Sequence, residues 1–117
     1  MNYKKNKSFE ERKKESQSIL EKYPERVPLI LEKLTNDNDT LIPEIDKNKY
    51  LVPKDLNVGQ LMYVIRKRLK ISPEKALFIF CNGNILKSND LISTVYEKST
   101  DEDGFLYLIY SGEATFG

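Results

Sequence analysis

Three observations predict an α+β domain. Stretches of helical periodicity and short β-prone runs follow one another in the order helix, strand, strand, helix, strand, turn, short helix, strand. Two of the runs, 26–33 and 105–110, are apolar on both faces, which indicates a sheet covered on both sides. The chain of 117 residues is long enough for one hydrophobic core and too short for two.

The N-terminal region is expected to be helical. Ser8 and Glu11 form a capping box, and the helical stretch should end before Pro24. Its apolar face is too small to hold a helix alone, so we expect the helix to dock on the folded body. The residues of this face are Phe9, Ile19, Leu20 and Tyr23.

Two strands should come next. In the run 26–33 the odd positions Val27, Leu29 and Leu31 should point to one face and Pro28 and Ile30 to the other. After a polar loop at 35–40, Tyr50 to Val52 form a β-prone run that Pro53 ends. Because proline cannot donate to a ladder, this second strand is expected at an open sheet edge.

The strand leads into an amphipathic helix. Asn57 is the expected N-cap, and Gln60 stands at the capping-box position. Apolar residues then follow at helical spacing and should be buried: Val58, Leu61, Met62, Ile65 and Leu69. Val64 and Arg68 lie beside this stripe and give the helix a mixed flank toward the strand.

The last third of the chain supplies the remaining elements. Residues 77–81 predict an interior strand, and Asn82-Gly83 predicts a tight hairpin turn. A short helix over 91–97 should be anchored by Leu91, Ile92, Val95 and Tyr96. The strand 105–110 should be central, and the final residues should hang free. This order matches a β-grasp (ubiquitin-like) roll whose extra N-terminal helices cover the opposite sheet face.

Composition narrows the function. The chain has no histidine and a single cysteine, Cys81, so it lacks the commonest general base, a thiolate zinc site and an internal disulfide. We therefore expect no enzyme activity and no cofactor or metal, with Cys81 a small core residue. Without a secretory or membrane-spanning apolar run, the protein is expected to be soluble and cytosolic.

Charge is distributed unevenly although the net charge is only +1. Lysine and arginine dominate the first fourteen residues, which suits contact with acidic membranes or acidic partners. A second basic cluster, 66–70, has few aromatic residues interleaved for base stacking. It is expected to be a solvated helix face, and nucleic acid is not an expected partner.

Three stretches, EKYPERVPLILEK, EIDKNKYLVPKDLNVGQLMYVIRKRLKISPEKALFIF and DEDGFLYLIYSGEATFG, together resemble the autophagy-related protein 8 family. Members of that family are ubiquitin-like modifiers attached to phosphatidylethanolamine on autophagic membranes. The resemblance runs from about residue 9 to residue 117 and implies a β-grasp core with two additional N-terminal helices. It suggests a helical extension over 1–24 and a ubiquitin-like domain with a flexible tail over 25–117.

The resemblance also implies a conjugation pathway that acts on Gly117. The glycine would be activated as an adenylate, passed between cysteine thioesters on activating and conjugating enzymes, and joined to the lipid amine. A cysteine protease would reverse the lipidation. The free protein is then expected in the cytoplasm, and the lipidated protein on autophagosome and vacuole or lysosome membranes.

A second implied function is recognition of short motifs in cargo receptors, with an aromatic residue, two spacers and an aliphatic residue. Such a peptide would pair with the strand edge at 49–52 and fill two pockets. The positions matching the aromatic pocket are Glu15, Ile19, Pro28, Ile30, Lys49, Leu51 and Phe105. The positions matching the aliphatic pocket are Tyr50, Val52, Pro53, Leu56, Leu61 and Val64. Acidic residues flanking the motif would meet Arg26, Lys47, Lys49 and Arg68.

Alternatives stay open at this point. The protein could be a non-covalent adaptor that binds linear peptides while Gly117 is inert. Ile30, Leu51 and Phe105 would be core residues in any β-grasp protein, whether or not they also line a pocket. Leu61 stands where relatives commonly carry phenylalanine, so the aliphatic pocket is expected to differ in shape.

Overall fold

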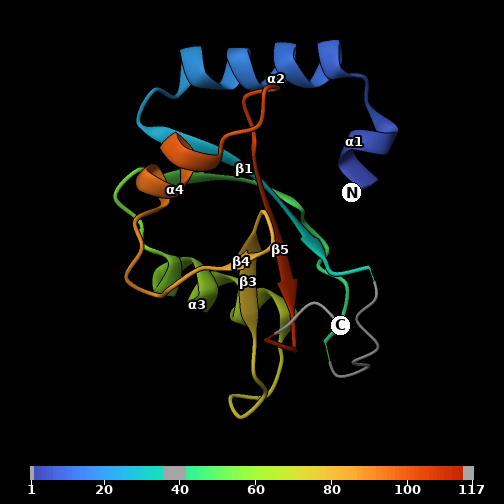
Figure 1. The fold of residues 1–117 in the computed structure, drawn as a ribbon, viewed down its shortest axis with the longest axis vertical. Coiled ribbons are helices and arrows are strands. Elements are labelled where there is room, and N and C mark those ends of the chain that lie inside the picture. Colours follow the sequence, from blue (N-terminus) through green and yellow to red (C-terminus); the bar gives the residue numbers. More distant parts are fainter. Residues whose placement is uncertain (1, 36–41, 115–117) are drawn as a thin grey trace.

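The computed structural model describes residues 2–35 and 42–114, and within these it contains one five-stranded sheet in the order β2-β1-β5-β3-β4 (Figure 1). The strands are β1 (Arg26–Lys33), β2 (Lys49–Pro53), β3 (Phe78–Cys81), β4 (Asn84–Ile85) and β5 (Leu106–Ser111). The helices are α1 (Asn2–Asn6), α2 (Phe9–Lys22), α3 (Val58–Leu69) and α4 (Ile92–Ser99). None of the helices in the described ranges is long and apolar enough to cross a membrane.

The pairing of the strands confirms the predicted fold class. β1 pairs antiparallel with β2 and parallel with β5, and β5 pairs antiparallel with β3. The last strand therefore lies in the middle of the sheet and the second strand at its edge, as the apolar pattern and Pro53 predicted. A mixed sheet in this order, with helix α3 packed on it, is the β-grasp roll.

Both faces of the sheet are covered by helices, as the doubly apolar strands predicted. In β1, Val27, Leu29 and Leu31 join the large core that also holds the buried residues of α3 and α4. Ile30 points to the other face, where it packs with Tyr3 of α1. Figure 1 shows α1 and α2 at the top of the molecule, away from α3.

Helix α2 docks only partly as predicted. Ile19 packs against the core cluster of Tyr3, Ile30 and Phe105, whereas Phe9 and Tyr23, also expected to pack inward, are each 40% exposed. The buried side chains of α2 are instead Arg12 and Ser16. The Arg12 guanidinium pairs with the carboxylate of Asp103, and the Ser16 hydroxyl donates a hydrogen bond to the backbone oxygen of the same residue. The helix covers a turn whose polar groups need partners, so polar residues hold it there.

Helix α3 follows its prediction closely. The side chain of Asn57 accepts a hydrogen bond from the amide of Gln60, and the Gln60 side chain accepts one from the amide of Asn57. Four of the five predicted stripe residues are buried, and Met62 is partly buried. Lys70 ends the helix in the left-handed conformation, with φ 55°.

Smaller differences occur in the last third of the chain. Asn82 and Gly83 have φ values of 50° and 82°, which confirms the predicted tight turn. Leu91 was expected to anchor α4, but it lies at the N-cap position and is 45% exposed, so that prediction was wrong. The predicted loop at 35–40 and the free terminus fall largely outside the described residues.

Candidate functional site

The free edge of the sheet is formed by β2. The amide of Leu31 donates to the carbonyl of Asn48 at 2.7 Å, which marks a hydrogen-bonded pair between β1 and the start of β2. Bonded and non-bonded pairs alternate in an antiparallel ladder, so Lys49 and Leu51 direct their backbone N–H and C=O groups away from the sheet. This edge can accept the backbone of another extended chain.

Two residues of β1, Pro28 and Arg26, lie beside this edge in positions that suit the pairing of β1 with β2. Pro28 lies opposite Leu51, at a position that forms no bond to β2, and pairing of β1 with β5 starts only at Leu29. The missing N–H of Pro28 therefore costs no ladder bond. Arg26 places its guanidinium Nη1 at 3.1 Å from the carbonyl oxygen of Leu51 and donates to it. A peptide that pairs here must share this oxygen with Arg26.

The side chains of β2 alternate between the two faces of the sheet. Tyr50 and Val52 belong to the core on the α3 side. Lys49 and Leu51 consequently face the α2 side, and the Lys49 ammonium donates to the carboxylate of Glu15 in α2. The residues predicted for the two pockets therefore lie on opposite faces of one sheet edge.

On the α2 side, the residues matching the aromatic pocket differ in exposure. Ile30 and Phe105 are fully buried and form a core cluster with Tyr3, as the core alternative for these two residues predicted. The partly exposed rim consists of Glu15, Ile19, Lys49 and Leu51, with buried Pro28 beside it. Tyr3 packs edge-on against Phe105, with 5.5 Å between the ring centroids. Tyr3 could not be predicted from the sequence, because a five-residue helix carries no periodicity that would reveal an inward position.

Glu15 is the electrostatic centre of this rim. Its carboxylate accepts hydrogen bonds from Lys49, the Tyr3 hydroxyl and Lys7, the last at 3.2 Å. Burial alone would raise the pKa of Glu15, but these hydrogen bonds outweigh it and lower the pKa to about 2. Burial and the bond to Glu15 raise the pKa of Tyr3. Glu15 is therefore ionised at neutral pH and holds the Lys49 ammonium at the rim.

On the α3 side, the residues matching the aliphatic pocket differ in exposure. Tyr50, Val52 and Leu61 are buried, whereas Pro53 and Val64 are exposed and Leu56 is partly exposed. Leu61 has no exposed surface and belongs to the main core. Burial raises the pKa of Tyr50, whose hydroxyl has no hydrogen-bond partner among the described residues.

The basic side chains expected to contact acidic residues beside a bound motif already contact other groups of the protein. Arg68 forms a bidentate ion pair with Asp46, in which Nε lies 2.7 Å from Oδ1. The Lys47 ammonium lies 5.2 Å from the centre of the Tyr50 ring. Together with the contacts of Arg26 and Lys49, this means that acidic residues of a peptide must compete with groups of the protein itself.

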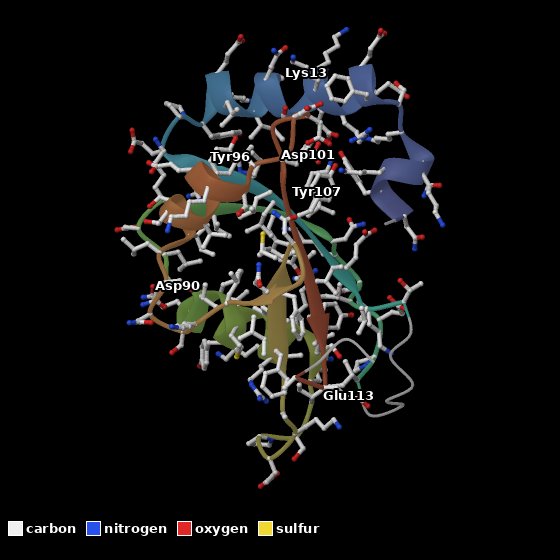
Figure 2. The ribbon with its side chains drawn as sticks, in the orientation of Figure 1. Lys13, Asp90, Tyr96, Asp101, Tyr107 and Glu113 are labelled. Carbon is white, nitrogen blue, oxygen red and sulfur yellow. The ribbon has the colours of Figure 1, made fainter. Side chains whose placement is uncertain are left out.

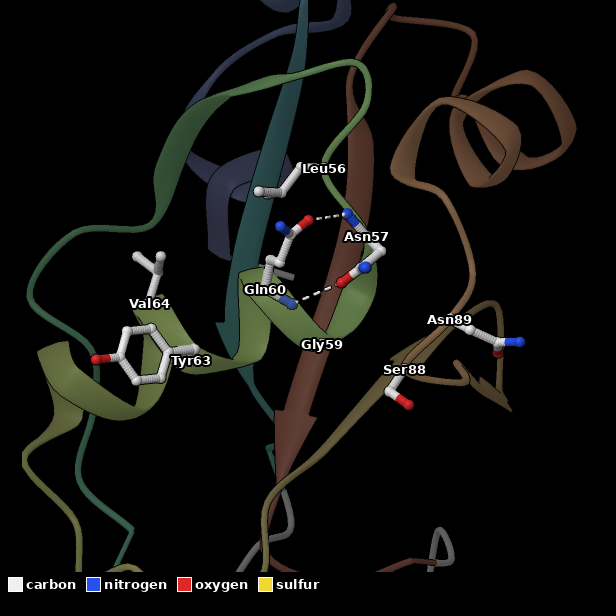
Figure 3. Close-up of a pocket in the computed structure, with 8 residues that line it drawn as sticks. All are labelled: Leu56, Asn57, Gly59, Gln60, Tyr63, Val64, Ser88 and Asn89. Atoms are coloured by element: carbon white, nitrogen blue, oxygen red, sulfur yellow. Dashed lines mark hydrogen bonds between the residues drawn. The ribbon is translucent and has the colours of Figure 1, made fainter.

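A further hollow of about 600 Å³ opens beside the aliphatic side of the edge (Figure 3). Its floor is the first turn of α3, where the amide of Gly59 donates to the carbonyl of Ser88 at 2.8 Å. A Cβ on Gly59 would stand 3.2 Å from that oxygen, so glycine allows the close approach. Gln60 is held at the rim by the capping box, and Tyr63 lies opposite Ser88. This hollow could not be predicted from the sequence, because Ser88 is distant from α3 along the chain.

The opposite face of the sheet carries a polar cluster. Asp103 accepts hydrogen bonds from Arg12, from the Tyr107 hydroxyl and from the amide of Phe105, the last at 2.9 Å. Figure 2 shows Tyr107 at the end of β5 that lies near α2. This cluster fixes α2, and therefore the position of Glu15, relative to the edge strand.

These features define a class of protein: a ubiquitin-like β-grasp domain with two N-terminal helices and an edge strand whose outer side is free. Residues 11–117 match the family described as "Autophagy protein Atg8 ubiquitin like", and the chain belongs to this Atg8 family.

Individual relatives agree with this assignment. The chain is 59% identical over 110 residues to autophagy-related protein 8 of Schizosaccharomyces pombe, covering 94% of this chain and 88% of that protein. It is 55% identical over 115 residues to autophagy-related protein 8e of Arabidopsis thaliana, covering 98% and 92%. The crystal structure of Trypanosoma brucei ATG8 superposes with a TM-score of 0.90 at 45% identity, covering 100% of this chain and 98% of that one.

Proposed function

We propose that this protein is a ubiquitin-like modifier that is conjugated through Gly117 to phosphatidylethanolamine on autophagic membranes. There it recruits cargo receptors and autophagy factors through short aromatic-x-x-aliphatic motifs. It is a substrate of its conjugation pathway, with no catalytic activity of its own. The free protein is cytoplasmic, and the lipidated protein is on autophagosome and vacuole or lysosome membranes.

Peptide recognition is supported by one observation: the residues predicted for the two pockets lie on opposite faces of the β2 edge. Side chains of an extended peptide alternate between faces, so residues three positions apart point to opposite sides. An aromatic residue and an aliphatic residue with two spacers between them have this separation. The geometry of the edge thus supports the spacing that the resemblance implies.

The conjugation rests on family membership and on the chemistry of glycine. The carboxylate of Gly117 attacks the α-phosphate of ATP and expels pyrophosphate, which gives an adenylate. A cysteine thiolate of the activating enzyme displaces AMP, and a cysteine of the conjugating enzyme then receives the acyl group by thioester exchange. The lipid amine attacks the thioester carbonyl, releases the thiol and forms the amide. Without a Cβ, glycine leaves its carbonyl open to each nucleophile.

The conjugation is tested by incubating the protein with the activating and conjugating enzymes, ATP and phosphatidylethanolamine liposomes. We expect an increase in intact mass equal to one phospholipid minus water, and no increase for Gly117→Ala. If the unmodified chain gains no mass while it still binds motif peptides, the protein is a non-covalent adaptor. A mass gain in the Gly117→Ala variant would contradict the assigned position.

The groove is tested by titrating a motif peptide against Leu51→Ala and Lys49→Ala. Central interface truncations commonly cost about 1 to 2 kcal/mol, so we expect about a tenfold loss of affinity for Leu51→Ala. Lys98→Ala, on the exposed side of α4, is the control and should bind as the unmodified protein does. Unchanged affinity of both edge variants would remove the groove from this assignment.

A further inference from the structure

We infer that Asn82 and Gly83 form a modification site that needs no enzyme. The backbone nitrogen of Gly83 attacks the side-chain carbonyl of Asn82, and water then converts the asparagine into aspartate or isoaspartate. The isoaspartate product opens the β3–β4 hairpin and exposes the thiol of Cys81. The site is independent of the peptide groove and of Gly117.

The sequence singles out Asn82 among the nine asparagines of the chain, because it alone is followed by glycine. A side chain on the following residue hinders the backbone nitrogen of that residue, and glycine has no Cβ to do so. The other asparagines precede tyrosine, lysine, aspartate, valine or isoleucine. Asn82 should therefore lose its amide before any other asparagine does.

The reaction consumes one water and releases one ammonia. The Gly83 N–H gives its proton to solvent base, its nitrogen bonds to Cγ of Asn82, and the amide C–N bond breaks as ammonia leaves. Water then opens the five-membered imide at one of its two carbonyls. Cleavage of the bond between the nitrogen and Cγ gives aspartate, and cleavage at the main-chain carbonyl gives isoaspartate, whose backbone runs through Cβ and Cγ.

The structure presents this dipeptide to solvent on a short hairpin. Asn82 and Gly83 are exposed, so water and hydroxide reach both. Strand β4 has only two residues, both exposed, and its register with β3 contains two residue pairs. An exposed element with so few contacts opens locally at low cost in free energy. Asn82 can then leave its φ of 50° and bring its side chain onto the Gly83 nitrogen.

The two products differ in what they do to the hairpin. Aspartate tolerates the left-handed φ of residue 82 as asparagine does, and the loop keeps its length. Isoaspartate adds one carbon to the backbone of a two-residue loop. Because a loop of this length fixes the register of its strands, the pair of Cys81 with Asn84 can no longer form. Isoaspartate, and not aspartate, therefore releases β4 from β3.

Cys81 lies directly before the loop and reports its opening. It is 5% exposed in the intact hairpin, and burial raises the pKa of its thiol. A hollow of about 430 Å³ is lined by Cys81 and, on its hairpin side, by Asn84 and Leu86. Release of β4 removes this side of the hollow, so that solvent reaches the sulfur and the thiolate forms more readily.

The modification is tested by intact mass and peptide mapping of the folded full-length protein during incubation at mildly alkaline pH. We expect the mass gain of an amide replaced by an acid, located at residue 82. Isoaspartate is detected there by methyl transfer from S-adenosylmethionine with an isoaspartate-specific methyltransferase. Asn82→Gln keeps an amide but cannot close a five-membered ring, so the variant should gain no mass. Exposed Asn84 and Asn89 are the internal controls and should keep their amides.

The opening of the hairpin is tested by the rate at which a disulfide reagent titrates Cys81. The isoaspartate-containing fraction should react at least about tenfold faster than unmodified protein, because a protected group becomes exposed. Asn82→Asp reproduces the other product and should react as slowly as unmodified protein.

The site is refuted if amide loss begins at another asparagine. It is also refuted if Asn82 keeps its amide in the folded protein while the urea-unfolded chain loses it. Unchanged thiol reactivity in protein that carries isoaspartate would overturn the release of β4.

Discussion

Replacing Arg12 with alanine tests how helix α2 is held on the sheet. The guanidinium lies against the fully buried carboxylate of Asp103, and the Arg12 side chain is only 10% exposed. Its Nε also donates to the backbone oxygen of Lys7 at 3.2 Å. The substitution removes both contacts and leaves the carboxylate of Asp103 buried without its counter-charge.

The magnitude follows from what Asp103 retains. Removing one partner of a buried ion pair commonly costs about 3 to 5 kcal/mol. Asp103 keeps the hydrogen bonds from the Phe105 amide and the Tyr107 hydroxyl, which partly compensate its charge. We therefore expect Arg12→Ala to lower the free energy of unfolding by about 2 to 3 kcal/mol. In an Asp103→Asn background the further cost should fall to about 1 kcal/mol, because no charge is left unpaired.

The assay is urea denaturation followed by circular dichroism, combined with hydrogen exchange of residues 9–22. Exposed Lys13 is the control position, and Lys13→Ala should change the free energy of unfolding by less than about 0.5 kcal/mol. Arg12→Ala should also accelerate exchange in α2 more than in α3. The reasoning is refuted if Arg12→Ala and Lys13→Ala have the same stability and the same exchange rates.

Three other changes have defined outcomes. Glu15→Gln should lower the free energy of unfolding by about 1 to 2 kcal/mol at pH 7, because the pKa of Glu15 is about 2 in the folded protein and about 4.5 in the unfolded chain. In urea titrations, the difference in stability between the variant and the unmodified protein should shrink as the pH falls from about 4.5 to 2. A difference that stays constant over this range would contradict the lowered pKa. Gly104→Ala should destabilise the folded protein by at least about 1 kcal/mol, because the φ angle of Gly104 is +92° and the new Cβ would stand 2.9 Å from the Cβ of Ser16. An unchanged melting temperature would exclude this clash. Lys70→Gly should stabilise the folded protein by about 0.5 to 1 kcal/mol, because glycine adopts the φ angle of 55° at this position without strain. A lower urea midpoint for the variant would contradict this prediction.

The sequence predicted those parts of the fold that depend on local chemistry. The capping boxes at Ser8 and Asn57, the turn at Asn82-Gly83 and the edge position of β2 all occur where short-range rules place them. Each depends on residues within a few positions of one another. The central place of β5 could also be predicted, because apolar residues on both faces require cover on both sides.

Contacts between distant residues could not be predicted in this way. The docking of α2 was assigned to an apolar face, of which Ile19 does pack on the core, but the prediction missed the pair between Arg12 and Asp103, 91 positions apart. The internal partners of Lys49 and Arg68 were missed for the same reason, since Glu15 and Asp46 lie on other elements. The hollow beside α3 also needs the segment at Ser88, which the chain brings back only after the β3–β4 hairpin.

The parallel pairing of β1 with β5 joins Leu29 to Leu106. Such a pairing closes a long loop, which is costly in conformational entropy. Asp103 lies in the turn that leads into β5, so the residue that holds α2 on the sheet is supplied by the C-terminal part of the chain. The position of Glu15 beside the edge strand therefore depends on a segment almost ninety residues further along the chain.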